Sequence, residues 1–125
     1  MEIYATGLNL LDSKIKTGEF KLILPYKMPL ILGHDLAGIV KEVGNNVKKY
    51  NVGDEVYARP TDFHIGTFAE YITVREEDLA FKPKNLSMEE AASVPLVALT
   101  AWQALVEIGQ LKKDKRYLFR QVREE

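Results

Sequence analysis

Short apolar runs separated by turn residues characterise the first third of the chain. Residues 3–8 form a run that favours a β-strand, and residues 9–18 carry apolar side chains at helical spacing. Within residues 22–32, Pro25 and Pro29 exclude a continuous helix or a central strand. The pattern therefore predicts a strand, a short helix and a surface loop, in this order.

The middle of the chain has the pattern of closely spaced strands. Residues 34–43 are expected to form a strand with Gly38 in its interior, a position where a bulge or a close backbone approach is common. Further strands are expected at residues 55–58 and 67–74, each after a turn that contains glycine. Short strands joined by such turns predict a small β-barrel.

The pattern of residues 87–109 is helical. Ser87 and Glu90 have the spacing of a capping box, so a helix is expected to begin there. Pro95 should interrupt this helix. An apolar face follows, and we expect its Trp102 to lie in the core: Leu96, Leu99, Trp102, Ala104, Leu105 and Ile108.

Composition narrows the class of protein. The chain has 125 residues, of which 46% are hydrophobic, so a single globular domain is expected. The 17 basic and 18 acidic residues give a formal charge of −1, which provides no case for nucleic acid or an anionic membrane as a partner. No apolar run approaches the roughly 20 residues of a membrane span, and no signal peptide is visible. A cytoplasmic location is the expectation.

The absence of cysteine limits the chemistry further. With no cysteine, the chain has no disulfide, no thiolate nucleophile and no Cys-bearing zinc site. His34 and His64 are the only imidazoles. His34 is followed by Asp35, but one imidazole and one carboxylate make a poor zinc site, because catalytic zinc normally has three protein ligands. We therefore expect no metal.

Several motifs in order carry a family resemblance. LGHDLAGIV at residues 32–40 is followed by VGDEV at 52–56, GTFAEY at 66–71, EAA at 90–92 and LTA at 99–101. This order resembles the medium-chain dehydrogenase/reductase family, over about residues 1–113. The resemblance implies a GroES-like β-barrel with short helices and a C-terminal helical segment, mainly β with α. In the family, this domain packs beside a Rossmann domain, which is absent here.

The resemblance also implies candidate site residues. The segment 9–12 looks like the zinc-free quinone oxidoreductase branch rather than the zinc branch. By this resemblance, Asn9 approaches the nicotinamide or the substrate oxygen, with Tyr4 as a second catalytic donor, and Thr100 lines the cofactor pocket. Asp12, His34 and Asp35 are assigned to the substrate pocket. The implied cofactor is NADPH or NADH, with no zinc, and hydrogen-bond donors would stabilise the developing enolate.

Each of these residues also has a simpler structural interpretation. Asn9 suits the cap of the helix that follows it. His34 can be a structural histidine that is held by hydrogen bonds. Asp12 and Asp35 can hold loops by accepting hydrogen bonds from backbone amides. The Thr100 hydroxyl can donate to a backbone carbonyl one helical turn earlier. Tyr4 can be a strand residue without a catalytic role.

Both ends of the chain depart from the family pattern. The family has one or two strands before the segment that begins at Glu2, so the chain is expected to be truncated at both ends. Residues 114–125 form a non-family tail. Allowed codons for residues 116–125 can be chosen so that the shifted frame reads Val-Phe-Ile-Gln-Ala-Gly-Ser-Gly-Gly, which resembles a strand and the glycine turn of a Rossmann domain. A frameshift near Lys115 is our hypothesis, and the coding DNA tests it.

Three functions remain open. The first is the substrate-side domain of an NAD(P)H-dependent, zinc-free oxidoreductase that reduces quinones, enones or alkenals and is inactive as a fragment. The second is a fragment of a zinc-type alcohol dehydrogenase. The third is a non-enzymatic remnant or interaction module. The expected partners are a small-molecule carbonyl or quinone and, through exposed sheet edges, further copies of the chain.

Overall fold

A computed structural model describes residues 1–113 of the chain. The non-family tail expected at residues 114–125 lies outside the described residues. The elements follow in chain order: β1 (Glu2–Gly7), α1 (Leu10–Thr17), β2 (Asp35–Ile39), β3 (Glu55–Ala58), the 3-10 turns η1 (Asp62–His64) and η2 (Glu76–Asp78), β4 (Leu79–Phe81), α2 (Met88–Ala92), α3 (Pro95–Trp102) and the π-helical turn η3 (Gln103–Ile108).

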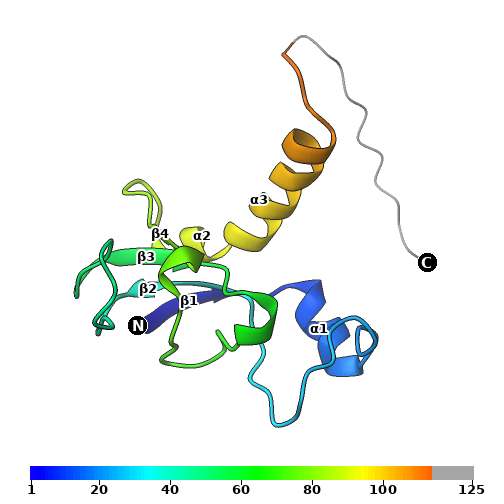
Figure 1. Ribbon diagram of the computed structural model, residues 1–125, viewed down its shortest axis with the longest axis horizontal. Helices are drawn as coiled ribbons and strands as arrows, with labels where there is room; N and C mark the ends of the chain where they lie inside the picture. The colour runs from blue at the N-terminus through cyan, green and yellow to red at the C-terminus, as the bar shows by residue number, and fades with distance from the viewer. Residues whose placement is uncertain (114–125) are drawn as a thin grey trace.

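The four strands form one antiparallel sheet in the order β1-β2-β3-β4. In the register of the first pair, Glu2 lies opposite Ile39 and Gly7 lies opposite Asp35. The other pairs continue the sheet through β3, which contacts both β2 and β4. This small antiparallel sheet with a few helices confirms the expected GroES-like fold class (Figure 1).

Gly38 has the close backbone approach that the sequence predicted. A Cβ atom at this position would lie 2.0 Å from the carbonyl oxygen of Glu2. The pairing of β1 with β2 is also irregular between Ile3 and Ala5, directly opposite. Only a residue without a side chain lets the two strands approach in this way.

The prediction of a strand at residues 67–74 is wrong. The structure has a single bridge in this segment, between Tyr71 and Glu2. Its backbone groups bond to two different segments: the Phe68 amide donates to the Leu32 carbonyl, and the Ile72 amide donates to the Met1 carbonyl. Residues 70–72 thus pair with the first residues of the chain, where the Ile3 amide also donates to the Glu70 carbonyl, but this pairing does not extend over residues 67–74.

The core consists of two small clusters. One contains Ala37 of β2 with Ala91 and Ala92 of α2, which packs across the first strands. The other contains Val40, Tyr50 and Val56 at the far end of the sheet. Small side chains in the first cluster bring α2 close to the sheet and so fix the position of the segment that leads into α3.

The helical segment divides as predicted, at Pro95. The Ser87 hydroxyl accepts from the Glu90 amide at 3.2 Å, and the Glu90 carboxylate accepts from the Ser87 amide at 2.8 Å, so the capping box is confirmed. Pro95 is the first residue of α3. Proline suits this position because its missing N–H would have no partner there. From Pro95, α3 extends away from the sheet (Figure 1).

Candidate functional site

A buried polar cluster joins four of the residues singled out in the sequence. Asn9 and Asp12 begin α1, while His34 and Asp35 lead into β2. The pairing of Gly7 with Asp35 places the residues that follow β1 beside those that open β2. The cluster is therefore a direct product of the sheet register.

Asp12 holds the two segments of the cluster together. Its carboxylate accepts hydrogen bonds from the backbone amides of Asn9 at 2.9 Å and Gly33 at 3.1 Å. It also contacts Nδ1 of His34 at 2.7 Å. Asp12 is only 2% exposed, so these donors replace the water that the carboxylate has lost. It holds a loop through backbone amides, which is the simpler of its two interpretations.

His34 is fully buried, and Asp12 sets its tautomer. Because a carboxylate accepts from Nδ1–H, the neutral ring carries its lone pair on Nε2. Nε2 is buried and has no hydrogen-bond partner among the described residues. An acceptor left without a partner costs less than a buried N–H in the same place, so this tautomer is the favourable one.

Asp35 links the start of α1 to the start of α3. Its Oδ2 accepts from Nδ2 of Asn9 at 2.9 Å, and its Oδ1 accepts from the Leu96 amide at 2.8 Å. Burial raises the pKa of the Asp35 carboxyl above its usual value, and the hydrogen bonds from Asn9 and Leu96 oppose this shift. One buried carboxylate thus orients a side chain and anchors a helix.

The contact with Asp35 fixes how the Asn9 amide is presented. Asn9 occupies the N-cap position of α1, as its simpler interpretation required. Its Nδ2 carries two N–H groups, and Asp35 accepts only one of them. The second N–H has no hydrogen-bond partner among residues 1–113 and can donate to a bound molecule. Asn9 can therefore cap the helix position and still serve as a donor.

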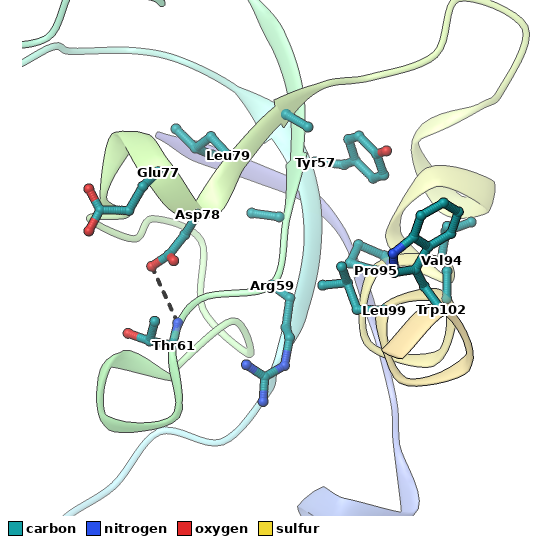
Figure 2. Close-up of a pocket in the computed structure, with 13 residues that line it drawn as sticks. Tyr57, Arg59, Thr61, Glu77, Asp78, Leu79, Val94, Pro95, Leu99 and Trp102 are labelled. Atoms are coloured by element: carbon teal, nitrogen blue, oxygen red, sulfur yellow. Dashed lines mark hydrogen bonds between the residues drawn. The ribbon is translucent and has the colours of Figure 1, made fainter. Parts of the chain in front are cut away.

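Two pockets that share lining residues lie at the base of α3, and we refer to them together as the two arms of a cleft. The larger arm is a pocket of about 500 Å³ between α3 and the strands β3 and β4. The smaller arm, about 340 Å³, lies between α3 and Leu11 of α1. Arg59 and Leu99 line both arms. Figure 2 shows these two residues in the wall of the larger arm.

The structure brings Thr100 to the cleft but not Tyr4. Thr100 lines the smaller arm, and its hydroxyl donates to the Leu96 carbonyl one turn earlier at 2.8 Å. Tyr4 is 58% exposed on β1, where it neighbours Glu2. Lys41, and to a smaller extent Tyr4, lowers the pKa of Glu2. A catalytic role for Tyr4 in the cleft finds no support in this position.

The three residues assigned to a substrate pocket are buried instead. Asp12, His34 and Asp35 are each exposed by 2% or less. None of them lines either arm of the cleft. Asn9 does not line either arm either, and it is held by Asp35, while Asp12 and His34 bond to each other and Asp12 accepts from backbone amides. A contact between any of them and substrate remains a prediction.

Sequence reasoning missed two features of the cleft. Arg59 follows β3 and forms an ion pair with Asp62, and no motif drew attention to it. Trp102, expected in the core, is 57% exposed and lines the larger arm. Of the predicted apolar face, Leu99 and Trp102 line the larger arm, and helical periodicity could not show that a cavity rather than packed side chains lies opposite them.

The cluster does not fit a zinc ion. Nδ1 of His34 is engaged by Asp12, and Asp35 is bonded to Asn9 and Leu96. Among residues 1–113, no group of three or more His, Cys, Asp or Glu side chains is arranged to hold a metal. A catalytic zinc site normally needs three protein ligands. In the same range, none of the helices has the length and apolar character required to cross a membrane.

Comparison with known proteins gives consistent matches. The alcohol dehydrogenase GroES-like domain family matches residues 1–84. The "NAD(P)H oxidoreductase RTN4IP1, mitochondrial" of Dictyostelium discoideum is 38% identical over 110 residues, which are 86% of this chain and 31% of that protein. The "2-methylene-furan-3-one reductase" of Solanum lycopersicum is 41% identical over 118 residues, covering 87% of this chain and 29% of that protein.

A solved structure agrees with these relatives. The quinone oxidoreductase from Coxiella burnetii superposes with a TM-score of 0.82 at 33% identity, covering 90% of this chain and 36% of that one. The chain thus spans about a third of the length of the proteins that it matches.

Proposed function

Because the chain belongs to the alcohol dehydrogenase GroES-like domain family, we propose that it is the substrate-side part of an NAD(P)H-dependent oxidoreductase that reduces quinones, enones or alkenals without zinc. The relatives support the reaction class, since they are named as NAD(P)H, furanone and quinone reductases. The observation that carries the proposal is the pair of hydrogen bonds at Asp35, which orients the Asn9 amide and also accepts from Leu96, a residue that lines the smaller arm.

The residues of the smaller arm suit one half of the cofactor. Thr100 lines this arm, and Asn9 lies at the start of α1, from which Leu11 reaches the same arm. A reduced nicotinamide bound there would supply the hydride. Asn9 would donate its second amide N–H to the substrate oxygen, whose negative charge grows as a conjugated carbonyl accepts hydride. A positioned donor of this kind is worth about 10²–10³ in rate.

The nucleotide would need further protein. Dinucleotides bind across a Rossmann domain, whose helix N-terminus holds the pyrophosphate. The described residues contain a small antiparallel sheet and no parallel sheet of that type. We therefore expect the 125-residue chain to have no reductase activity alone. A cytoplasmic location remains a prediction, since a relative is named as mitochondrial.

A chimera tests the proposal. Residues 1–113 would replace the matching part of the Coxiella burnetii quinone oxidoreductase, and loss of NADPH absorbance would be followed with a naphthoquinone as substrate. We expect turnover by the chimera and none by the chain alone. Asn9→Ala should lower kcat of the chimera by about 100-fold. Asn46→Ala, at an exposed turn, should leave kcat unchanged.

Two results would contradict the proposal. Turnover by the chain alone, clearly above a control without protein, would remove the need for a second domain. A folded chimera that binds NADPH but reduces no quinone, enone or alkenal would show that this domain does not serve that reaction.

A further inference from the structure

One face of α3 looks onto a cavity. Pro95, Ala98, Leu99 and Trp102 recur at intervals of three, one and three residues, so they share a helix face. In Figure 2, the labelled members of this face lie opposite Tyr57 of β3. Between the helix and the sheet lies the pocket of about 500 Å³. An inward-facing apolar stripe of a helix normally packs directly on its sheet, and here it does not.

The size and walls of this pocket suit a small organic molecule. The pocket is open to solvent, and its lining residues Leu99 and Trp102 are about half exposed, at 48% and 57%. Ligand pockets are commonly about 300–1,000 Å³, with mostly apolar walls and a few polar groups. Here Trp102 and Tyr57 supply aromatic surface, and Arg59 and Thr61 supply the polar end. The pocket therefore favours a planar ring that carries one or two acceptors.

The charges around the pocket favour a neutral ligand over an anion. The Arg59 guanidinium is paired with Asp62, and Arg75 pairs with both Glu77 and Asp78. No positive charge in the wall is left unpaired to bind an anion, and the two carboxylates Glu77 and Asp78 share the one guanidinium of Arg75. The guanidinium has five N–H donors, and Asp62 is its only hydrogen-bond partner among residues 1–113. The remaining donors can bind the oxygen of a neutral carbonyl.

We propose that this pocket binds a neutral, planar conjugated carbonyl compound, a quinone or an aryl enone, with its ring against Trp102 and an oxygen toward Arg59. The inference rests on the proposed function, for which it identifies where the substrate ring lies. Arg59 and Leu99 also line the arm that contains Thr100, so a ring in this pocket lies next to the place proposed for the nicotinamide.

Trp102 makes the proposal measurable on the whole chain, because it is the single tryptophan. Menadione, a neutral naphthoquinone, would be titrated into the 125-residue protein while tryptophan emission and lifetime are recorded. The protein has no cysteine, so quinone addition to thiols cannot confuse the result. We expect saturable static quenching, with weaker binding by at least about tenfold for a naphthoquinone sulfonate, whose negative charge the pocket does not match.

Two variants on the same helix provide a matched comparison. Leu99 lines the pocket and is 48% exposed, whereas Val97 is 54% exposed and lies outside the pocket. Leu99→Asp should raise the dissociation constant of menadione by about tenfold or more, and Val97→Asp should change it by less than about twofold. Circular dichroism confirms that both variants are folded, and the titrations are made at a concentration where light scattering shows a monomer.

Three results would overturn the proposal. The first is linear, non-saturating quenching equal to that of N-acetyltryptophanamide. The second is an equal effect of the two variants. The third is tighter binding of the sulfonate than of menadione. An active chimera without saturable binding here would overturn only the pocket assignment, and saturable binding with an inactive chimera would overturn only the proposed function.

Discussion

Gly38 is the residue at which the sheet has the least room for a side chain. We expect Gly38→Ala to lower the free energy of unfolding by about 2 kcal/mol or more, because its Cβ would lie 2.0 Å from the Glu2 carbonyl oxygen and the strands would have to separate. Urea unfolding measures the loss. Gly44→Ala is the control, since its Cβ would meet nothing nearer than 3.9 Å. Equal stability of the two variants would contradict this account.

The buried carboxyl of Asp35 predicts a pH dependence of stability. Its folded-state pKa is raised by burial, so above about pH 4 the folded protein holds a proton that the unfolded chain has released. Stability attributable to Asp35 is therefore greatest below about pH 4 and falls as the pH rises to the folded-state pKa. Above that value it changes no further.

Comparison with Asp35→Asn isolates this contribution. Urea unfolding of both proteins across the acidic range should show the wild type losing stability relative to the variant as the pH rises from about 4. The two proteins share all other titrating groups, so the contributions of these groups cancel when the free energy of unfolding of one protein is subtracted from that of the other. A wild type that gains stability relative to Asp35→Asn over this window would contradict the raised pKa.

At this scale the sequence predicted the identities of the site residues better than their roles. Asn9, Asp12, His34 and Asp35 were singled out, and the structure brings them together. That Asp12 accepts from His34 depends on the pairing of β1 with β2, which local patterns do not specify. Arg59 was missed because its significance comes only from the two arms that meet at it.

Among the sequence signals for helices and strands, the capping box at the start of α2 gives the clearest test. Ser87→Ala should lower the free energy of unfolding by about 1 kcal/mol, because the Glu90 amide loses its acceptor at the start of α2. Ser87→Asp keeps an acceptor and should cost less than about 0.5 kcal/mol. Thermal unfolding of the three proteins measures both effects, and equal losses in the two variants would show that the cap contributes nothing.

Elements with their own local signals were predicted well. The strand at residues 55–58 and the helix that follows Asn9 lie where hydrophobic spacing and turn residues placed them. The strand expected at residues 67–74 failed because alternation describes one exposed and one buried face. Whether a ladder forms depends on a neighbour of matching length, and here the start of β1 pairs only with residues 70–72, while Phe68 bonds to Leu32.

The molecule as a whole exposes an apolar helix. Val97, Trp102 and Ile108 are 54%, 57% and 81% exposed along α3 and η3. A helix that is apolar on all sides is normally covered by other protein. We expect the purified chain to self-associate through this segment, and a double variant, Val97→Asp with Ile108→Asp, to be more monomeric at the same concentration.

Size-exclusion chromatography with light scattering tests this expectation over a range of concentrations. A monodisperse wild-type monomer at the highest concentration would contradict it. An exposed double variant such as Glu19→Gln with Lys21→Gln, in the loop after α1, serves as the control and should associate like the wild type.

The bond between Asp35 and the Leu96 amide has a mechanical consequence. It ties the first turn of α3 to the same carboxylate that orients Asn9. The far end of the helix can swing about this tether while Asn9 stays aligned, but a sliding motion of the whole helix must break the bond or drag Asn9 with it. We therefore expect any opening of the cleft to proceed as a pivot of α3 about Leu96, which leaves the bond between Asp35 and Asn9 in place.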